Sequence, residues 1–471
     1  MIYHHLFEKF RKQDMVTGSV IGAGHFATAI VSQQNYVERL RVPVVADLNL
    51  ESAKNAFLKA EIPEDLIVYA GEEAEASRAL AAGKYVYTDN CLMATTLPEI
   101  DVVTEATGVP EAGARYMLSA LEHGKHVAAV SKETDSVIGP YLRKLAREKG
   151  LVYSFVDGDQ PALLIQMVEW ARLIGLTVIS AGKARDGEFI LDEKNQTVSI
   201  AADGITVHED AVAHIPGDYM QYFQEIPKGE GMAELYLSKR DEVLAQLPGA
   251  GAFDLCELTM MANALGLKPA IPPTRKATLR ITELPIAYCA KKNGGVYDDE
   301  GIIDVHTNLR RKDEGGMGGG VFMVVRCDNA YANYILTTKG QIPNHDLSTA
   351  VIYRPYHLCG VETSTTLLCA GLLGIDTGSK EYKPVWDLVR VAARDIKKGE
   401  LLGGDHDAKL IAHIIPATKR APESPAPAHL LDGRTVREDI KAGQVITYSM
   451  VDAPAGSVLW DLRLRQENTT F

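Results

Sequence analysis

The 471-residue chain has few cysteines and no long apolar run, and these shortages exclude several classes of protein. Its six cysteines stand at positions 91, 256, 289, 327, 359 and 369, and no pair has the CxxC spacing of a zinc or redox site. We therefore expect reduced, mostly buried thiols. No segment is long enough to span a bilayer, and the N-terminus lacks the apolar core of a signal peptide. We expect a cytoplasmic protein with no membrane partner.

Positive charge is also in short supply. The chain has 49 lysines and arginines against 62 aspartates and glutamates, and its formal net charge is -13. An acidic chain repels phosphate backbones, which disfavours a nucleic-acid partner. The sequence contains no GxSxG, HExxH or Walker motif, so nothing in it supports a hydrolase or a kinase. At roughly 150 residues per domain, the length predicts about three domains.

The texture of the chain changes along its length. Up to about Val156, short β-branched runs alternate with amphipathic stretches, which predicts an α/β domain with a parallel sheet. The next part is less regular and reads as α+β, and the last part reads as mostly β. We place the domains at residues 1–156, 157–380 and 381–471. We expect the first to be a dinucleotide-binding domain and the second to carry catalysis and dimerisation.

The first predicted strand ends in a GxGxxA loop, Gly22-Ala-Gly24-His-Phe-Ala27. In a Rossmann domain, the first glycine of this loop allows a tight turn and the second lets the backbone approach a pyrophosphate. Asp47 ends the second predicted strand, at the position of a ribose-binding carboxylate. A carboxylate there favours NAD over NADP, because it repels a 2′-phosphate. The alternative interpretation is a structural turn without a cofactor.

The C-terminal part contains a near-repeat 44 residues apart. Asp395-Ile-Lys-Lys-Gly399 recurs as Asp439-Ile-Lys-Ala-Gly443, and each copy predicts a charged turn, a glycine with positive φ and a strand. The Pro/Ala-rich residues 416–429 between the copies are expected to form a stiff exposed loop. The triplet Asp405-His-Asp is likewise expected in an exposed loop and not at a metal.

Three strings resemble known families. Residues 100–108 (IDVVTEATG) and 124–132 (GKHVAAVSK) resemble homoserine dehydrogenases, and the repeat resembles the SAF domain. A homoserine-dehydrogenase-like front with a SAF tail is similar to the DXR-like (DRL) reductoisomerase family over essentially the whole chain. The resemblance implies three domains, a homodimer and conversion of 1-deoxy-D-xylulose 5-phosphate to 2-C-methyl-D-erythritol 4-phosphate with NADPH, in isoprenoid synthesis. The dinucleotide contacts that we predict are Gly22, Ala23, Gly24, His25, Phe26, Asp47, Thr107 and Gly108.

One departure bears on the substrate. Homoserine dehydrogenases carry an Asp with a Lys four residues later on their catalytic helix, whereas Asp254 is followed here by Leu258. The missing amine argues against homoserine. Two alternatives stay open: an NAD(P)-dependent, homoserine-dehydrogenase-like oxidoreductase of a small amino or hydroxy acid, and a non-catalytic nucleotide sensor.

The predicted reaction needs cations for a developing oxyanion and hard oxygen ligands for Mg²⁺ or Mn²⁺. Lys132 follows a strand at the carboxyl edge of the sheet, where Rossmann folds bind ligands. We predict five catalytic residues: Lys132, Lys183, Arg185, Asp254 and Glu257. We place the metal on Asp157 and Asp159, which are spaced by two at a strand end. The alternatives are a surface turn for Asp157 and Asp159, and helix capping for Asp254 and Glu257.

The substrate phosphate needs cations or backbone amides. Arg310 and Arg311 precede the glycine-rich residues 315–320, a combination that can form an anion nest. His357 offers a titratable imidazole nearby. We predict these three residues as substrate contacts, against the alternatives of a hairpin connection and a core histidine.

Overall fold

The computed structural model describes residues 2–201 and 211–471. Contacts between residues divide the chain into two compact units. The first unit comprises residues 1–162, 358–409 and 417–471, and the second comprises residues 163–357 and 410–416. The N-terminal part and most of the C-terminal part therefore share one unit, and the predicted boundaries near 156 and 380 stay predictions.

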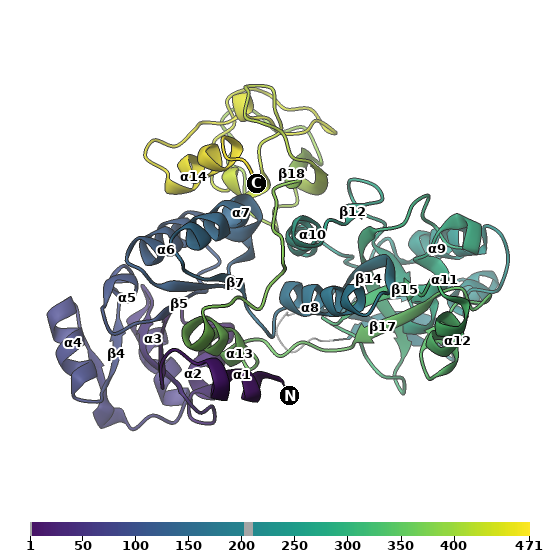
Figure 1. Ribbon diagram of the computed structural model, residues 1–471. Helices are drawn as coiled ribbons and strands as arrows, with labels where there is room; N and C mark the ends of the chain where they lie inside the picture. Colours follow the sequence, from purple (N-terminus) through teal and green to yellow (C-terminus); the bar gives the residue numbers. More distant parts are fainter. Residues whose placement is uncertain (1, 202–210) are drawn as a thin grey trace. The chain divides into compact units, whose positions relative to one another are not determined.

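The first unit is built on a seven-stranded parallel sheet with the order β3-β4-β2-β1-β5-β6-β7. Helices α6 and α7 cover one face, and α2 and α13 cover the other (Figure 1). Because both faces are covered, the central strands are β-branched and buried. The strands are β1 (Val16–Ile21), β2 (Leu40–Ala46), β3 (Ile67–Tyr69), β4 (Tyr85–Thr88), β5 (Val102–Glu105), β6 (His126–Ala129) and β7 (Tyr153–Phe155). The helices are α1 (Ile2–Phe10), α2 (His25–Gln33), α3 (Leu50–Lys59), α4 (Glu73–Ala81), α5 (Met93–Thr96), α6 (Pro110–Glu122), α7 (Lys132–Glu148) and α13 (Ser364–Leu368).

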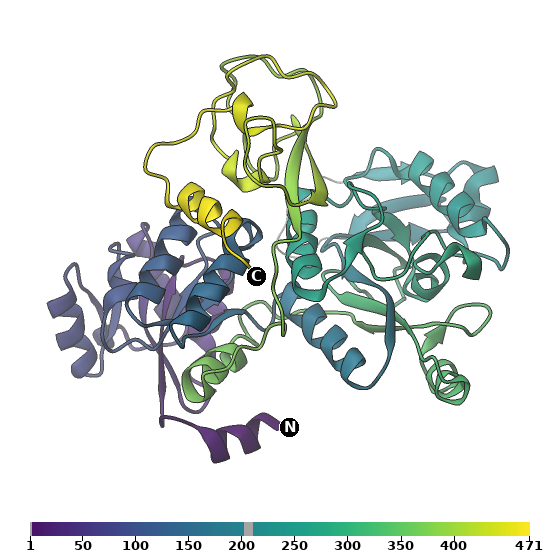
Figure 2. The same ribbon diagram turned by 45° about the horizontal axis from the view of Figure 1, so that its top comes forward.

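The C-terminal residues of this unit form little regular structure besides β18 (Trp386–Ala392) and α14 (Val458–Glu467), which packs on α6 and α7 (Figure 2). The two copies of the repeat pair with each other. Ile396 and Ile440 exchange backbone hydrogen bonds of 2.8 Å, Lys397 reaches Asp439 at 2.8 Å, and Lys441 reaches Asp395 at 2.8 Å. The repeat is therefore a pseudo-twofold unit in which each copy caps the other.

Two expectations for this part hold only in part, since residues 418–423 and His406 are exposed but their neighbours are not. Within residues 416–429, Ala426, Ala428 and His429 are buried, because the segment returns to pair with the second copy. The side chain of Asp405 is only 8% exposed, and it forms an ion pair with the buried Arg390. Proline-rich composition therefore gave no measure of burial.

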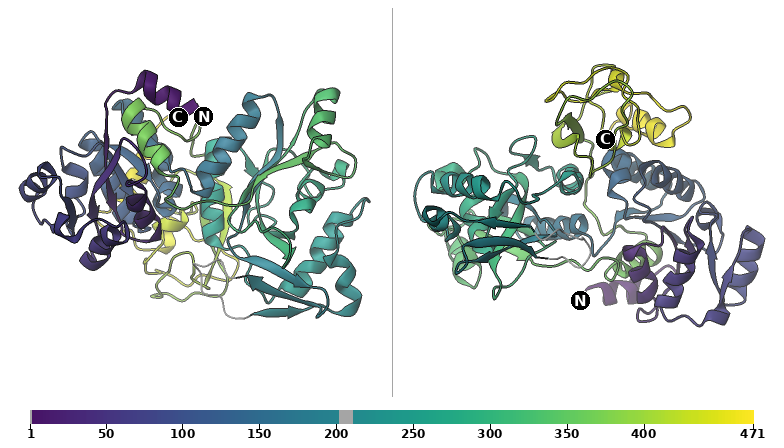
Figure 3. Two further views of the ribbon diagram at one scale, coloured as in Figure 1. Left: turned by 90° about the horizontal axis from the view of Figure 1, so that it is seen from below. Right: turned by 180° about the vertical axis from the view of Figure 1, so that it is seen from behind.

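The second unit is built on a mixed sheet with the order β11-β10-β9-β14-β8-β15-β17-β16, and β12 and β13 also pair with β14 (Figure 3). Helix α10 has 13 of its residues buried, so it lies in the core of this unit and contacts β14. The strands are β8 (Thr177–Ala184), β9 (Glu188–Asp192), β10 (Thr197–Ala201), β11 (Val212–His214), β12 (Lys268–Pro269), β13 (Ala277–Leu279), β14 (Ile302–Arg311), β15 (Val321–Arg326), β16 (Ile342–Pro343), β17 (Ala350–Arg354) and β19 (Leu410–Pro416). The helices are α8 (Gln160–Leu173), α9 (Met232–Leu244), α10 (Ala252–Leu265), α11 (Leu284–Ala287) and α12 (Ala330–Thr338).

The predicted fold class is confirmed: the N-terminal sheet is parallel and Rossmann-like, and the central sheet is mixed. Four of the six cysteines are buried and all six are free. Within the described residues, every helix falls short of the length and apolarity that a membrane crossing requires.

Candidate active site

The glycine-rich loop after β1 has the geometry that a dinucleotide requires. Gly22 has a φ of +92°, and a Cβ there would collide with the backbone of Ala106 and Thr107, so the position demands glycine. Gly24 has no neighbouring atom within 4 Å of the place a Cβ would take, which leaves room for a phosphate. No side chain caps the N-terminus of α2, which begins at His25 and Phe26, so its backbone N–H groups suit an anion.

Asp47 directly follows β2 and lies beside this loop. Its Oδ2 accepts a hydrogen bond of 2.6 Å from the Ala23 N–H, and its Oδ1 accepts one of 2.8 Å from the Asn49 N–H. The carboxylate is thus fixed at the edge of the loop, where a ribose hydroxyl of the adenosine would meet it. The residues that fit a nicotinamide dinucleotide are therefore the glycine loop and Asp47.

Thr107 and Gly108 follow β5, which ends in a buried acid, Glu105, that sequence reasoning missed. The Thr107 N–H donates to Glu105 Oε1 at 3.0 Å, and the Gly108 N–H donates to the Ser131 hydroxyl at 2.9 Å. Glu105 is fully buried, and burial raises the pKa of its carboxyl. Glu105 stands inside the string IDVVTEATG, and its acidic character in an otherwise apolar strand end was the available signal.

Lys132 opens α7, and its ammonium lies 3.1 Å from Asp159 Oδ2, with both side chains largely buried. Asp159 and Asp157 are each 5% exposed, so the surface-turn alternative is wrong. Two threonines cover this turn: the Asp157 N–H donates to Thr366 Oγ1 at 2.8 Å, and the Thr363 hydroxyl donates to the Asp157 carbonyl at 2.8 Å. Lys132 and Asp159, which the sequence analysis predicted separately, therefore form an ion pair in the first unit.

The second unit buries a separate ion cluster. Lys183 on β8 is fully buried, and its ammonium lies 3.0 Å from Asp254 Oδ1 and in contact with Glu257 Oε2. Asp254 and Glu257 share one face of α10 at the i and i+3 positions, as the sequence predicted. Asp254 also caps α10, because its Oδ2 accepts the Gly251 N–H at 2.8 Å. Asp254 is 9% exposed and the other two are 1% or less, so Asp254 is the member that solvent reaches.

The charges in this cluster hold one another ionised. Burial alone would lower the pKa of Lys183, but the charges of Glu257 and Asp254 raise it well above its ordinary value. Burial would raise the pKa of Asp254, but Lys183 and the capping N–H lower it instead. Arg185 follows on β8, donates to the Pro248 carbonyl and adds positive charge near Asp254. Lys183 and Asp254 therefore form a fixed ion pair and are not poised to titrate near neutral pH.

A further lysine near Asp254 was missed by sequence reasoning. Lys276 has a φ of +53° and Thr274 a φ of +59°, in a region that non-glycine residues rarely adopt. Burial lowers the pKa of Lys276, and the charges of Asp254 and Asp304 oppose that shift. Strained backbone of this kind gathers at functional sites, but no sequence pattern announced it.

The predicted phosphate site is occupied by the chain's own carboxylates. Arg310 Nε donates to Glu188 Oε2 at 2.8 Å, and the Met317 N–H of the glycine-rich loop donates to Glu188 Oε1 at 2.6 Å. Arg311 forms ion pairs with Glu193 and Glu314. The loop does bind an anion, but that anion is Glu188.

The glycines of this loop are needed for close packing. A Cβ on Gly319 would collide with the His357 ring and with Asp186, so His357 lies against the end of the loop. Arg310 and Arg311 are both partly exposed, but each already forms ion pairs with carboxylates of the chain. His357 is therefore the member of the predicted substrate set that the structure leaves beside the β8 end.

The metal prediction was tested on the arrangement of possible ligands. Across residues 2–201 and 211–471, no group of three or more His, Cys, Asp or Glu side chains is close enough to hold a metal ion. Asp159 and Asp254 are both paired with lysines. Mg²⁺ and Mn²⁺ prefer several oxygen ligands, so the metal at Asp157 and Asp159 stays a prediction, and we derive no step through a metal.

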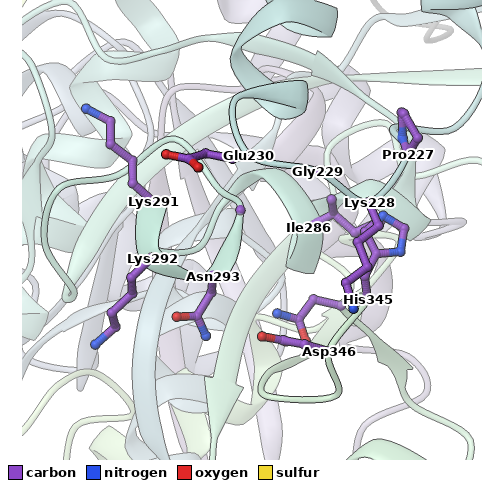
Figure 4. Close-up of a pocket in the computed structure, with 12 residues that line it drawn as sticks. Pro227, Lys228, Gly229, Glu230, Ile286, Lys291, Lys292, Asn293, His345 and Asp346 are labelled. Atoms are coloured by element: carbon purple, nitrogen blue, oxygen red, sulfur yellow. The ribbon is translucent and has the colours of Figure 1, made fainter.

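The second unit also has a polar cavity of about 410 Å³. Figure 4 shows Lys291 and Lys292 extending away from Asn293, His345 and Asp346. Lys291 forms an ion pair with Asp298 at 2.7 Å, and His345 Nε2 bonds the Ile226 carbonyl at 2.9 Å. Lys291 and His345 therefore bond to groups outside the lining of the cavity, and we assign the cavity no function.

Three parts of the chain match models of known families. Residues 22–155 match the model of the homoserine dehydrogenase NAD-binding domain, and residues 250–363 match the oxidoreductase DRL catalytic domain. Residues 389–452 match the SAF domain. The chain therefore carries the domains of an NAD(P)-dependent oxidoreductase. Their order is the DRL-like architecture, which confirms the resemblance seen in the sequence.

Individual relatives match only parts of the chain. A homoserine dehydrogenase of Pseudomonas aeruginosa is 35% identical over 104 residues, which is 21% of this chain and 23% of that protein. A 1-deoxy-D-xylulose 5-phosphate reductoisomerase from Zymomonas mobilis in complex with NADPH is 20% identical with a TM-score of 0.27, covering 37% of this chain and 46% of that one. A DOX-P reductoisomerase with fosmidomycin and magnesium is 13% identical with a TM-score of 0.31, covering 54% and 58%. Scores this low carry no argument about substrate.

Proposed function

We propose that the protein is a reductoisomerase that converts 1-deoxy-D-xylulose 5-phosphate to 2-C-methyl-D-erythritol 4-phosphate with a nicotinamide dinucleotide. The observation that carries this proposal is the Lys183–Asp254–Glu257 cluster, because two of its members fall inside the DRL catalytic-domain match. A bound reduced dinucleotide supplies hydride to an aldehyde carbon.

The chain's own residues have distinct tasks in this reaction. Asp254 is ionised and is the solvent-reached member of its cluster, so it accepts hydrogen bonds from substrate hydroxyls and orients them. Lys183 and Glu257 lie behind it and position its carboxylate. Lys132, held by Asp159, donates a hydrogen bond to an oxygen that gains negative charge as hydride arrives.

The resemblance implies NADPH, whereas the position of Asp47 favours NADH. Asp47 is fixed against the glycine loop by two backbone N–H groups, so a 2′-phosphate would meet a held carboxylate. Activity with NADH and with NADPH should be compared directly. We expect Asp47→Ser to shift the preference toward NADPH.

The test is an assay of purified protein with 1-deoxy-D-xylulose 5-phosphate, reduced dinucleotide and Mn²⁺. We expect oxidation of the dinucleotide and formation of 2-C-methyl-D-erythritol 4-phosphate, identified by mass spectrometry. The absence of oxidation with both dinucleotides under these conditions would refute the proposal. Omission of Mn²⁺ in a parallel reaction tests the metal prediction separately.

One observation favours a second candidate, an oxidoreductase acting on a small amino or hydroxy acid. Although Leu258 replaces the lysine expected on α10, Lys183 brings an amine from β8 to 3.0 Å from Asp254. The argument against homoserine is therefore weaker than the sequence alone suggested. Reduction of NAD⁺ or NADP⁺ by homoserine, without any turnover of the deoxyxylulose substrate, would support this candidate.

A further inference from the structure

The first unit contains a cavity of about 420 Å³ between α6 and the SAF-matched part of the chain. None of the predicted dinucleotide or catalytic residues lines it. Its wall is formed by the first turns of α6, by the segment around His429 and by the segment that leads into α14. It is a pocket that the proposed function does not use.

A buried polar cluster begins at this pocket: His429 and Asp432 line it, and Asp405, 3.8 Å from His429 Nε2, joins them to Arg390. Arg390 forms an ion pair with Asp405, and His429 Nδ1 lies 3.1 Å from Asp432 Oδ2. Arg390 and His429 are each at least nine-tenths buried. Yet Arg390 Nε and Nη1, His429 Nε2 and Asp432 Oδ1 find no hydrogen-bond partner among the described residues. Buried polar atoms are nearly always paired, so four such atoms in one cluster point to a polar ligand or to ordered water.

Two arginines of the pocket wall are held loosely. Arg115 Nη2 is 4.0 Å from Glu111 Oε1, and Arg434 Nε donates to the Asp432 carbonyl at 3.4 Å. Glu111 is committed elsewhere, because its carboxylate caps α14 through the Val458 N–H at 2.8 Å. Each guanidinium therefore retains donors that match a carboxylate or a phosphate.

The remaining wall combines apolar surface with hydrogen-bond acceptors. Its apolar members are Val109, Pro110, Leu430, Pro454, Leu459 and Trp460. Asp432 offers an acceptor for hydroxyl groups. We propose that this pocket binds a small anion that carries hydroxyl groups, with Arg115 and Arg434 on the carboxylate or phosphate and with Asp432 and His429 on the hydroxyls. The binding does not depend on the proposed reaction.

The test is isothermal titration calorimetry of the full chain with three five-carbon probes. Ribonate presents a carboxylate, ribose 5-phosphate presents a phosphate, and ribitol presents neither. We expect at least one anion to bind and ribitol to bind at least about tenfold more weakly, since each arginine contributes about tenfold through charge-assisted hydrogen bonds. The tighter of the two anions identifies the head group.

Variants connect this binding to the pocket. In the Arg115→Ala, Arg434→Ala double variant, we expect a loss of about a hundredfold in affinity. Arg437→Ala is the matched control, because Arg437 is exposed, pairs with Asp452 at 3.4 Å and is not part of the pocket wall. Both arginines of the pocket are partly exposed, so the double variant should fold, which circular dichroism checks. Unchanged affinity in that variant, equal binding of ribitol, or no binding of either anion would overturn the proposal.

Discussion

Replacement of Lys183 by Met tests the buried ion cluster most directly. Lys183 is fully buried and opposes two carboxylates, one of which is 1% exposed. Removing one partner of a buried pair leaves charge without compensation and costs about 3–5 kcal/mol. We therefore expect Lys183→Met to destabilise the second unit by an amount in that range, although Met matches the length and shape of the lysine stem.

The composition of the cluster predicts an order among related variants. It holds one positive and two negative charges, so Glu257→Gln leaves a balanced pair and should cost less than Lys183→Met. The variant that combines Lys183→Met with Glu257→Gln, called the double variant below, retains a single carboxylate, that of Asp254. This carboxylate also accepts a hydrogen bond from the Gly251 N–H. We expect stability to fall in the order Glu257→Gln, then the double variant, then Lys183→Met.

Hydrogen exchange measured by mass spectrometry suits this test, because it reports local opening and can be followed along the single helix α10. Lys268→Met is the matched control, since Lys268 is on the surface of the same unit, and we expect a change below about 0.5 kcal/mol. If Lys183→Met protects α10 as well as the unaltered chain does, or if the double variant is the least stable, our account of the cluster is wrong.

Three further predictions concern the first unit. Gly22→Ala should destabilise it, because the positive φ and the Ala106 backbone exclude a Cβ, whereas Gly24→Ala should leave thermal stability unchanged and weaken NADH binding measured by fluorescence. Lys132→Met should lower kcat by at least about a hundredfold with little change in dinucleotide affinity, as loss of an oxyanion donor does, and a change confined to affinity would contradict this role. Burial raises the pKa of Asp135 to about 6 from 3.8, so the stability that its protonated form provides is present below about pH 4 and is lost as the pH rises through about 6. Urea unfolding should show Asp135→Asn gaining up to about 3 kcal/mol over the unaltered chain between these pH values, and a gap that does not change with pH would refute the assignment.

Much of the first sheet could be predicted from sequence, because its central strands are buried on both faces. The runs at β1, β2 and β5 are rich in valine and isoleucine, and the glycine loop follows the first of them. Strands β3 and β4 have only three and four residues and mix tyrosine with apolar side chains, so their sequences show no clear pattern. Short segments give too few positions for a pattern to emerge.

The geometry of the Lys183–Asp254–Glu257 cluster was predicted in part for a related reason. The spacing of Asp254 and Glu257 placed both on one face of a helix, which is information inside a single element. The lysine that joins them comes from β8, far away in the chain, and the search for it at position 258 followed helix spacing alone. Contacts between elements depend on the sheet order, which no local pattern supplies.

The net charge of -13 explains why the predicted phosphate site at Arg310 was wrong and why Arg115 was overlooked. Arginine beside glycine suggested a phosphate site at Arg310, but an acidic chain has carboxylates to spare, and Glu188 fills that site. In such a chain, a cation available to a ligand is one whose neighbouring carboxylates are committed elsewhere. Glu111 is committed to the start of α14, which leaves Arg115 at 4.0 Å from it. The placement of internal anions, and not the density of basic residues, therefore decides where this protein can bind an external one.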